Sequence, residues 1–316
     1  MNLHVNKPVA GKSSINFGLY PKYLEIKTDV FSVITLPEYE SIMKFLDGHP
    51  NVDDGWIYAG LQETLDLYGN VRKKPYSGRV FSLPKTHVLE LSGAYLQEDL
   101  DFIIWCLSFF TGMRLTSTQG GFLDATPIKP WKLVDFCVAG PNEHDAIQVA
   151  LNYLNERKLQ PLECRRIEAI IHSLFLSQRP QNLHFEKFQY LYMAIDGCFS
   201  IMWDNRDRVQ HSKKPIHANR IRWMCEEIEI LTPFWAEGEE NIASVRNDNF
   251  HEAIFFGRPL GFSVFKETSI HTKKNDILLQ MEALVCRLLV AILGVKDIGY
   301  INSGLSSRDY HLLKLK

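Results

Sequence analysis

Apolar residues recur at intervals of three and four along the second half of the chain, from about residue 142 to residue 292. This spacing is typical of α-helices that bury one face. Six successive segments have it, and proline or glycine lies in most of the breaks between them. The segments are Ile147–Leu154, Ile167–Leu174, Phe185–Met202, Ile221–Leu231, Ile242–Phe256 and Leu278–Ile292. The pattern predicts a helical bundle over residues 141–316.

The first 140 residues predict short strands and turns instead. Tyr23–Leu36 is rich in β-branched and aromatic side chains in alternation, as strands are. One helix is predicted over Gln97–Phe110, ending at Gly112. Further strands are predicted at residues 56–59, 79–83, 88–91 and 131–138. We therefore expect an α+β protein, with a small mixed domain over residues 1–140, a boundary near Gly140-Pro141 and a helical domain over residues 141–316.

The charge balance limits how the chain can meet nucleic acid. A formal net charge of -2 and a pI of about 6.6 argue against a protein that coats nucleic acid through bulk attraction. Any RNA contact therefore needs a local basic surface. The densest basic stretch holds His211 and His217 together with Arg206, Arg208, Lys213, Lys214, Arg220 and Arg222. These six cations are candidate RNA-binding residues, and a solvated linker is an equally good explanation of the stretch.

Cysteine spacing and the apolar segments indicate the compartment. The six cysteines are far apart, with no Cys-x-x-Cys pair, and are expected to be buried free thiols, which fits a reducing environment. No basic segment followed by an apolar run opens the chain. The apolar runs Phe102–Met113 and Leu284–Val295 are too short to span a bilayer. We expect a cytoplasmic protein without membrane contact.

The segment Val245–Ala253 holds the residues with the clearest chemical potential. Arg246 and His251 have four residues between them, and Asn247 directly follows the arginine. The three residues 247–249 are Asn, Asp and Asn, which are poor helix formers. Two explanations remain open: these residues cap a first helical turn, or the helix accepts them because they have a function.

Arginine and histidine occur at similar spacing elsewhere, and about two such pairs are expected by chance. The other pairs are Arg166 with His172, Arg179 with His184, and Arg206 with His211. The first lies on a predicted amphipathic helix and the second beside a proline, so neither is favoured. The third is the main alternative to Arg246, because Asp207 supplies a polar residue after its arginine.

Helical geometry bears on how Arg246 and His251 can act together. Asn247 and His251 share one face of a helix, whereas Arg246 lies about 140° from His251 around the axis. One straight helix therefore does not easily direct Arg246 and His251 at the same atom. Two copies related by a twofold axis can bring them to a shared site. The spacing favours a composite site in a homodimer or higher homo-oligomer.

The segment Arg-Asn-Asp-Asn-Phe-His-Glu-Ala at residues 246–253 resembles the R-x4-6-H signature of HEPN domains. Further segments resemble the ApeA-like branch of that family, and the resemblance covers residues 143–312. These segments are Phe188–Met202, His251-Glu252-Ala253, Gly257–Gly261, Leu284–Leu289, Gly294 and Tyr300. Residues 107–112, Leu-Ser-Phe-Phe-Thr-Gly, resemble part of the leading domains of such proteins.

The resemblance implies an all-α HEPN-type bundle and a metal-independent endoribonuclease, a hydrolase that acts as a toxin or in antiviral defence. Arg246, Asn247 and His251 match the family's catalytic positions. RNA is the implied substrate, and residues 1–140 would sense a trigger or bind a partner protein. The alternative is a catalytically inactive HEPN-like module that binds RNA or protein.

These residue types suit metal-free RNA cleavage, in which the neighbouring 2′-hydroxyl is the nucleophile. Histidine titrates near neutral pH and transfers protons, while arginine stabilises the charge on phosphate oxygens. Asn247 could position either group. The chain has no His-Glu-x-x-His, no Gly-x-x-x-x-Gly-Lys and no nuclease-like carboxylate cluster. We therefore expect neither a metal ion nor another cofactor.

Overall fold

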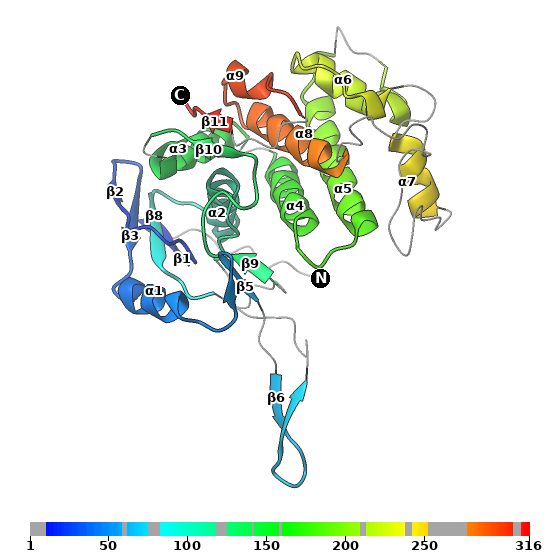
Figure 1. Ribbon diagram of the computed structural model, residues 1–316. Helices are drawn as coiled ribbons and strands as arrows, with labels where there is room; N and C mark the ends of the chain where they lie inside the picture. The colour runs from blue at the N-terminus through cyan, green and yellow to red at the C-terminus, as the bar shows by residue number, and fades with distance from the viewer. Residues whose placement is uncertain are drawn as a thin grey trace, which may run out of the picture. The chain divides into compact units, whose positions relative to one another are not determined.

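The computed structural model describes residues 11–58, 62–74, 83–117, 125–140, 142–157, 160–208, 213–237, 242–251, 277–305 and 311–316 (Figure 1). The chain has both helices and sheets, with strands concentrated in its first part, so the α+β prediction is confirmed. It divides into unit 1, Met1–Leu133, and unit 2, Val134–Lys316. This division lies seven residues before the predicted boundary, because strand β10 (Phe136–Val138) pairs within unit 2.

Unit 1 contains a four-stranded antiparallel sheet in the order β1-β8-β3-β2. Its strands are β1 (Lys12–Phe17), β2 (Glu25–Lys27), β3 (Phe31–Thr35) and β8 (His87–Ser92). Alternate side chains are buried, and Ile15, Leu89 and Val33 lie at successive positions across three neighbouring strands. This alternation gives the sheet one apolar face.

The predicted strand Tyr23–Leu36 is in fact two strands joined by a turn. The Thr28 hydroxyl accepts hydrogen bonds from the backbone N–H groups of Val30 and Phe31 and donates one to the Phe31 carbonyl. A threonine that satisfies backbone groups in this way favours a turn over a continuous strand. The apolar alternation continues through the turn, so the sequence pattern did not reveal the break.

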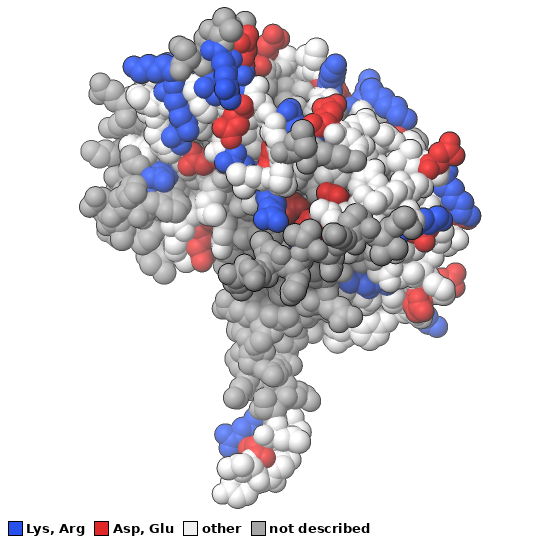
Figure 2. Space-filling model, turned by 180° about the vertical axis from the view of Figure 1, so that it is seen from behind, with Lys and Arg blue, Asp and Glu red and all other residues white. Residues whose placement is uncertain are grey.

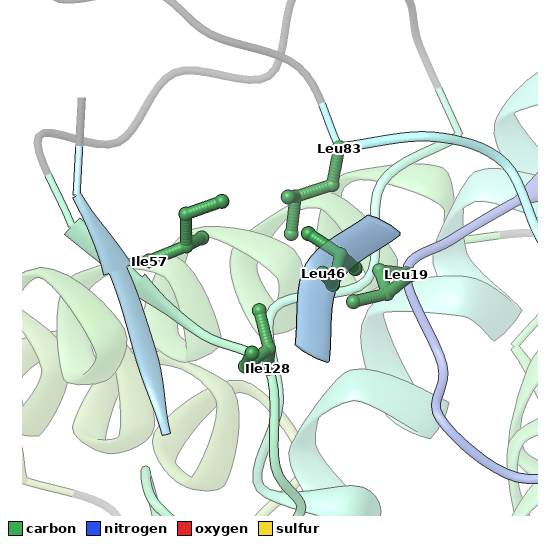
Figure 3. Close-up of a cluster of buried hydrophobic side chains, with 5 residues drawn as sticks. All are labelled: Leu19, Leu46, Ile57, Leu83 and Ile128. Atoms are coloured by element: carbon green, nitrogen blue, oxygen red, sulfur yellow. The ribbon is translucent and has the colours of Figure 1, made fainter. Parts of the chain in front are cut away.

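Besides the apolar face of the sheet, unit 1 has a cluster of buried apolar side chains (Figure 3). Leu46 reaches it from α1 (Tyr39–Asp47) and Ile57 from β5 (Trp56–Tyr58). Leu19, Leu83 and Ile128 complete it. Strand β5 pairs with β4 (Val52–Asp53) and β9 (Ala125–Pro127). Leu83 was predicted to end a strand; it lies outside strands here, and residues 79–82 of that prediction lie outside the described residues.

Helix α2 (Gln97–Thr111) matches the predicted helix and ends at Gly112, which has a left-handed φ of 60°. The Asp99 carboxylate accepts the backbone N–H of Leu96 at the start of the helix. Helix α2 packs against β1. Such caps at both ends explain why the sequence defined this helix well.

A separate hairpin joins β6 (Gln62–Leu65) to β7 (Val71–Lys74). The Asp66 carboxylate orders its turn by accepting the backbone N–H groups of Tyr68 and Asn70. Leu67 and Tyr68 at the tip are 102% and 87% exposed. Leu65 and Val71 beside them are also exposed, so the tip is an apolar surface within the described residues.

Unit 2 is a helical bundle built around α5 (His184–Asp204). Helix α5 packs against both α4 (Pro161–Ser177) and α8 (Ile277–Ile292), and its apolar side chains are buried there (Figure 1). The remaining elements are α3 (Asn142–Glu156), η1 (His217–Asn219), α6 (Arg220–Glu227), η2 (Phe234–Ala236), α7 (Ile242–His251), α9 (Ile298–Ile301) and β11 (His311–Leu313). The six predicted helices correspond to α3–α8.

Two predicted elements are shorter than expected. Helix α6 ends at Glu227, and Leu231, predicted on its buried stripe, is 91% exposed. Of the predicted strand at residues 131–138, only β10 is a strand, and it pairs in parallel with β11. Of the predicted Ile242–Phe256 segment, residues 252–256 lie outside the described residues.

An ion pair between a buried arginine and a half-buried aspartate joins the residue before β10 to helix α8. Arg287 on α8 is fully buried, and its Nη1 lies 2.6 Å from an Asp135 carboxylate oxygen. The Tyr300 hydroxyl donates to the other oxygen of Asp135 at 2.6 Å. The guanidinium also donates to the Ser303 hydroxyl and to backbone carbonyls. Each nitrogen of the buried Arg287 guanidinium therefore has a hydrogen-bond acceptor.

Among the described residues, no helix has the length and apolar character needed to cross a membrane. Five of the six cysteines are buried, as predicted, and Cys137 is half-buried.

Candidate active site around Arg246

Helix α7 carries all three predicted catalytic residues: Arg246, Asn247 and His251 lie within Ile242–His251. Ile242, only 1% exposed, begins the buried face of the helix, which continues with Ala243 and Val245. Arg246 is half-buried at the edge of this face. The side chains of Asn247 and His251 lie outside the described residues, so the helix fixes only their positions along its axis.

The buried face of α7 packs against the two 3-10 turns, η1 and η2. Turn η2 begins after Pro233, and its Trp235 is fully buried. The Trp235 indole N–H donates to the Gln280 amide oxygen of α8 at 2.9 Å. This hydrogen bond holds η2 against helix α8 of the bundle, and it gives the buried indole N–H of Trp235 an acceptor. The turn against which α7 packs is therefore fixed to the bundle.

Next to Arg246 lies a group of polar side chains from three other elements. On η1, Nε2 of His217 is joined to the Tyr192 hydroxyl of α5 by a hydrogen bond of 2.9 Å. The two rings also stack, with centroids 5.7 Å apart and planes 25° from parallel. One bond and one stacked face therefore hold the half-buried imidazole in one orientation.

Asp196 lies one helical turn after Tyr192 on α5, on the same face. Its carboxylate oxygen is 3.2 Å from Nη1 of Arg220, the first residue of α6. The Arg220 guanidinium also lies over the Phe199 ring, 4.7 Å from its centroid. The arginine is thus held by a carboxylate and an aromatic face.

The electrostatics of these side chains involve Arg246. Burial lowers the pKa of His217 below its usual 6.5, the positive charges of Arg220 and Arg246 lower it further, and Asp196 opposes them. Burial raises the pKa of the Tyr192 phenol, and Arg246 acts against that rise. The positive charge of Arg246 therefore acts to lower the pKa of both His217 and Tyr192. At neutral pH this leaves His217 as an uncharged imidazole beside two guanidinium groups.

We call Tyr192, Asp196, His217, Arg220 and Arg246 the α7 polar cluster. From the sequence, Arg220 and Arg246 were separate candidates, and His217 was only part of a basic stretch. Tyr192 and Asp196 were not candidates. The cluster joins residues up to 54 positions apart, and no local motif marks them. The one signal in the sequence is that Tyr192 and Asp196 are four residues apart, which places a hydroxyl and a carboxylate on the same face of a helix.

Most of the predicted RNA-binding cations have partners within the chain. Arg206 lies over the Trp203 ring at 3.5 Å, Lys214 lies 5.4 Å from the Phe199 ring centroid, and Arg222 is 3.9 Å from Glu226. Arg208 and Lys213 are exposed. Trp203 and Trp223 beside this stretch are buried. On the face drawn in Figure 2, basic and acidic side chains are interspersed rather than separated.

The alternative arginine–histidine pairs differ in their surroundings. Arg166 pairs with Asp204 at 2.5 Å on the surface of the bundle. Arg179 lies in the loop before α5, as its neighbouring proline predicted. His211, the partner predicted for Arg206, lies outside the described residues.

Within the described residues, no group of three or more His, Cys, Asp or Glu side chains is placed to hold a metal ion. No family model matches the chain, and searches of curated proteins and of solved structures find no similar protein.

Proposed function

We propose that this chain is a metal-independent endoribonuclease of the HEPN type, with Arg246, Asn247 and His251 as its catalytic residues. The observation that carries the proposal is the position of Arg246. Arg246 lies on α7, the helix that also carries Asn247 and His251. Its charge also acts on a second histidine, His217 of η1, and helps to keep that imidazole uncharged. A local set of proton-transfer and phosphate-binding groups of this kind suits an acidic protein that has no bulk attraction for RNA.

In the proposed reaction, the 2′-hydroxyl oxygen of one nucleotide attacks the adjacent phosphorus atom. A base removes the 2′-hydroxyl proton, the bond from phosphorus to the 5′-oxygen breaks, and an acid protonates that oxygen. The products are a 2′,3′-cyclic phosphate and a 5′-hydroxyl. His251 transfers one of the two protons, and Arg246 stabilises the charge on the phosphate oxygens. Asn247 orients one of them through a hydrogen bond.

We further propose that the site is completed by a second copy of the chain. Along α7, Arg246 and His251 lie about 140° apart around the axis, and Asn247 shares the His251 face. A twofold axis beside α7 would let the arginine of one copy meet the histidine of the other. The enzyme would then be active as a homodimer or larger homo-oligomer.

The proposed setting is the cytoplasm, in defence against phage or as a toxin. Unit 1 would receive the trigger or bind a partner protein. Under this proposal, expression of the wild-type chain is toxic to its host cell, and His251→Ala relieves the toxicity.

The experiment that tests the activity is incubation of the purified chain with total RNA in the presence of EDTA. Arg246→Ala and His251→Ala are compared with two control variants, Arg165→Ala on α4 and His184→Ala at the start of α5, both of exposed side chains. Loss of cleavage in the first two variants alone supports the proposal. Activity that EDTA abolishes would indicate a metal hydrolase instead, and wild-type binding of RNA without cleavage would indicate a binding module.

A further inference from the structure

We infer that His217, Arg220 and Arg246 together bind a phosphodiester group of RNA, with Tyr192 holding the imidazole in place. This inference rests on the proposed function and extends its site from α7 to η1 and α6. It adds a histidine that the R-x4-6-H spacing does not contain.

The contact between Tyr192 and His217 fixes the orientation of the imidazole. The Tyr192 hydroxyl is hydrogen-bonded to Nε2 of His217 at 2.9 Å, and the two rings are stacked with their centroids 5.7 Å apart. Because the Tyr192 hydroxyl takes Nε2, Nδ1 is the nitrogen of His217 that we assign to the ligand. Two side chains fixed against each other in this way lose little entropy when a ligand binds.

The charges of the α7 polar cluster favour a singly charged anion as ligand. Arg220 and Arg246 supply two positive charges near His217, and Asp196 supplies one negative charge through its pair with Arg220. With His217 and Tyr192 neutral, the formal charges of the five side chains in the α7 polar cluster sum to +1. A phosphodiester carries one negative charge, and guanidinium groups bind its oxygens with directed hydrogen bonds.

Binding of such an anion should change the protonation of the His217 imidazole. In the absence of a ligand, burial and the two arginines keep His217 uncharged, while Asp196 on α5 acts in the opposite sense. A bound phosphodiester brings negative charge next to His217 and offsets Arg220 and Arg246, so it favours the imidazolium form. Binding of the diester should therefore be accompanied by proton uptake at His217 and should be tighter at lower pH.

The test uses the full-length chain with histidine labelled by 13C at Cε1, and NMR titration of His217 from pH 4.5 to 8. The probe is thymidylyl-(3′→5′)-thymidine, which has one phosphodiester and no 2′-hydroxyl and so cannot be cleaved by the proposed route. We expect the pKa of His217 to rise by about 0.5 unit or more with the probe bound, a threefold or greater preference of the probe for the protonated form. His217→Gln assigns the signal.

Variants test which cations form the site. Arg220→Met and Arg246→Met should each reduce the affinity for the dinucleotide at pH 6 by about fivefold or more, as expected for loss of a charge-assisted contact. Arg165→Met, on exposed α4 surface, should leave it unchanged. Tyr192→Phe keeps the stacked ring but removes the hydroxyl, and it should also weaken binding.

Inorganic phosphate at the same concentration forms a second arm. If inorganic phosphate shifts the His217 signal and the dinucleotide does not, the cluster binds a terminal phosphate and the RNA assignment is overturned. If RNA is cleaved but the dinucleotide leaves the His217 pKa unmoved, this inference fails while the nuclease remains. If the dinucleotide raises the pKa and no RNA is cleaved, the phosphodiester site stands and the nuclease fails.

Discussion

The hydroxyl of Tyr192 lies 2.9 Å from Nε2 of His217, and the two rings stack on each other. This contact joins the central helix α5 to the 3-10 turn η1, and η1 packs directly against α7, which carries Arg246. The position of Arg246 is therefore coupled to the bundle core through two aromatic rings rather than through the helix backbone alone.

Tyr192→Phe should weaken this connection without removing the stacked ring. We expect the free energy of unfolding to fall by about 0.5–1.5 kcal/mol, because one partly buried hydrogen bond is lost. Urea unfolding followed by circular dichroism measures the change. Tyr190→Phe, two residues away on the same helix, is the control and should have no comparable effect. Equal effects of the two variants would mean that the Tyr192 hydroxyl contributes nothing specific.

Asp135→Ala should destabilise unit 2 strongly, because it leaves the fully buried Arg287 charge without its carboxylate. Loss of one partner of a buried ion pair typically costs about 3–5 kcal/mol. Asp204→Ala removes the partner of Arg166 in a pair that is partly exposed on both sides, and it should cost no more than about 1 kcal/mol. Chemical denaturation of both variants compares the two pairs directly. Similar losses would contradict the role assigned to burial.

Gly197→Ala should destabilise the packing of α5 on α4. A Cβ added at Gly197 would lie 2.6 Å from Cγ1 of Ile170, which is too close for any real contact. The overpacking cost, about 1–3 kcal/mol, should exceed the gain of about 1 kcal/mol in helix propensity.

A double-mutant cycle with Ile170→Ala tests that explanation, because alanine at position 170 removes Cγ1. In the Ile170→Ala background, Gly197→Ala should be neutral or stabilising, with a coupling of about 1 kcal/mol or more. Additive effects of the two substitutions would mean that the destabilisation by Gly197→Ala does not come from contact with Ile170.

The sequence predicted the helices of unit 2 well because each buries a regular apolar stripe, as Ile167, Ile170 and Leu174 do on α4. It failed where structure depends on distant partners. Leu231 continues an apolar stripe but follows the end of α6 and is exposed. Thr28 breaks a strand whose apolar alternation continues on both sides.

The candidate site was predictable only in part, for the same physical reason. The helix that carries Arg246 could be found from its apolar periodicity, and Arg246 itself from its spacing to His251. Tyr192 and His217 meet through folding over 25 positions, and η1 is a three-residue turn too short to have a periodic pattern. A lone histidine in a basic stretch therefore gave no sign that a tyrosine would fix its orientation.

Lys85 in unit 1 should make stability depend on pH in the alkaline range. Its ammonium donates to the Thr116 carbonyl and hydroxyl, and burial, aided by Arg114 and opposed by Asp101, lowers its pKa to about 8 from 10.5. Between these two values the unfolded chain binds more protons than the folded chain, so the Lys85 contribution to stability rises with pH. Below pH 8 both states are protonated and the contribution is constant.

Thermal unfolding from pH 7.5 to 10 measures this effect as a difference between variants. Relative to Lys85→Met, the wild-type chain should gain stability as the pH rises through that range. Lys12→Met, at a largely exposed position, should follow the wild-type curve. Parallel curves for wild type and Lys85→Met would contradict the lowered pKa.

If Arg246 of one copy and His251 of another meet at one scissile phosphate, two inactive variants should restore activity to each other when they are mixed. Arg246→Ala and His251→Ala are each purified, mixed under conditions that exchange subunits, and assayed for 2′,3′-cyclic phosphate ends on RNA in EDTA. Half of the dimers then contain one copy of each variant, and each of these has one site with both residues intact. We expect the mixture to recover about a quarter of the wild-type activity, while neither variant alone is active. An active wild type with no recovery in the exchanged mixture, or a wild type that cuts no RNA, would contradict it.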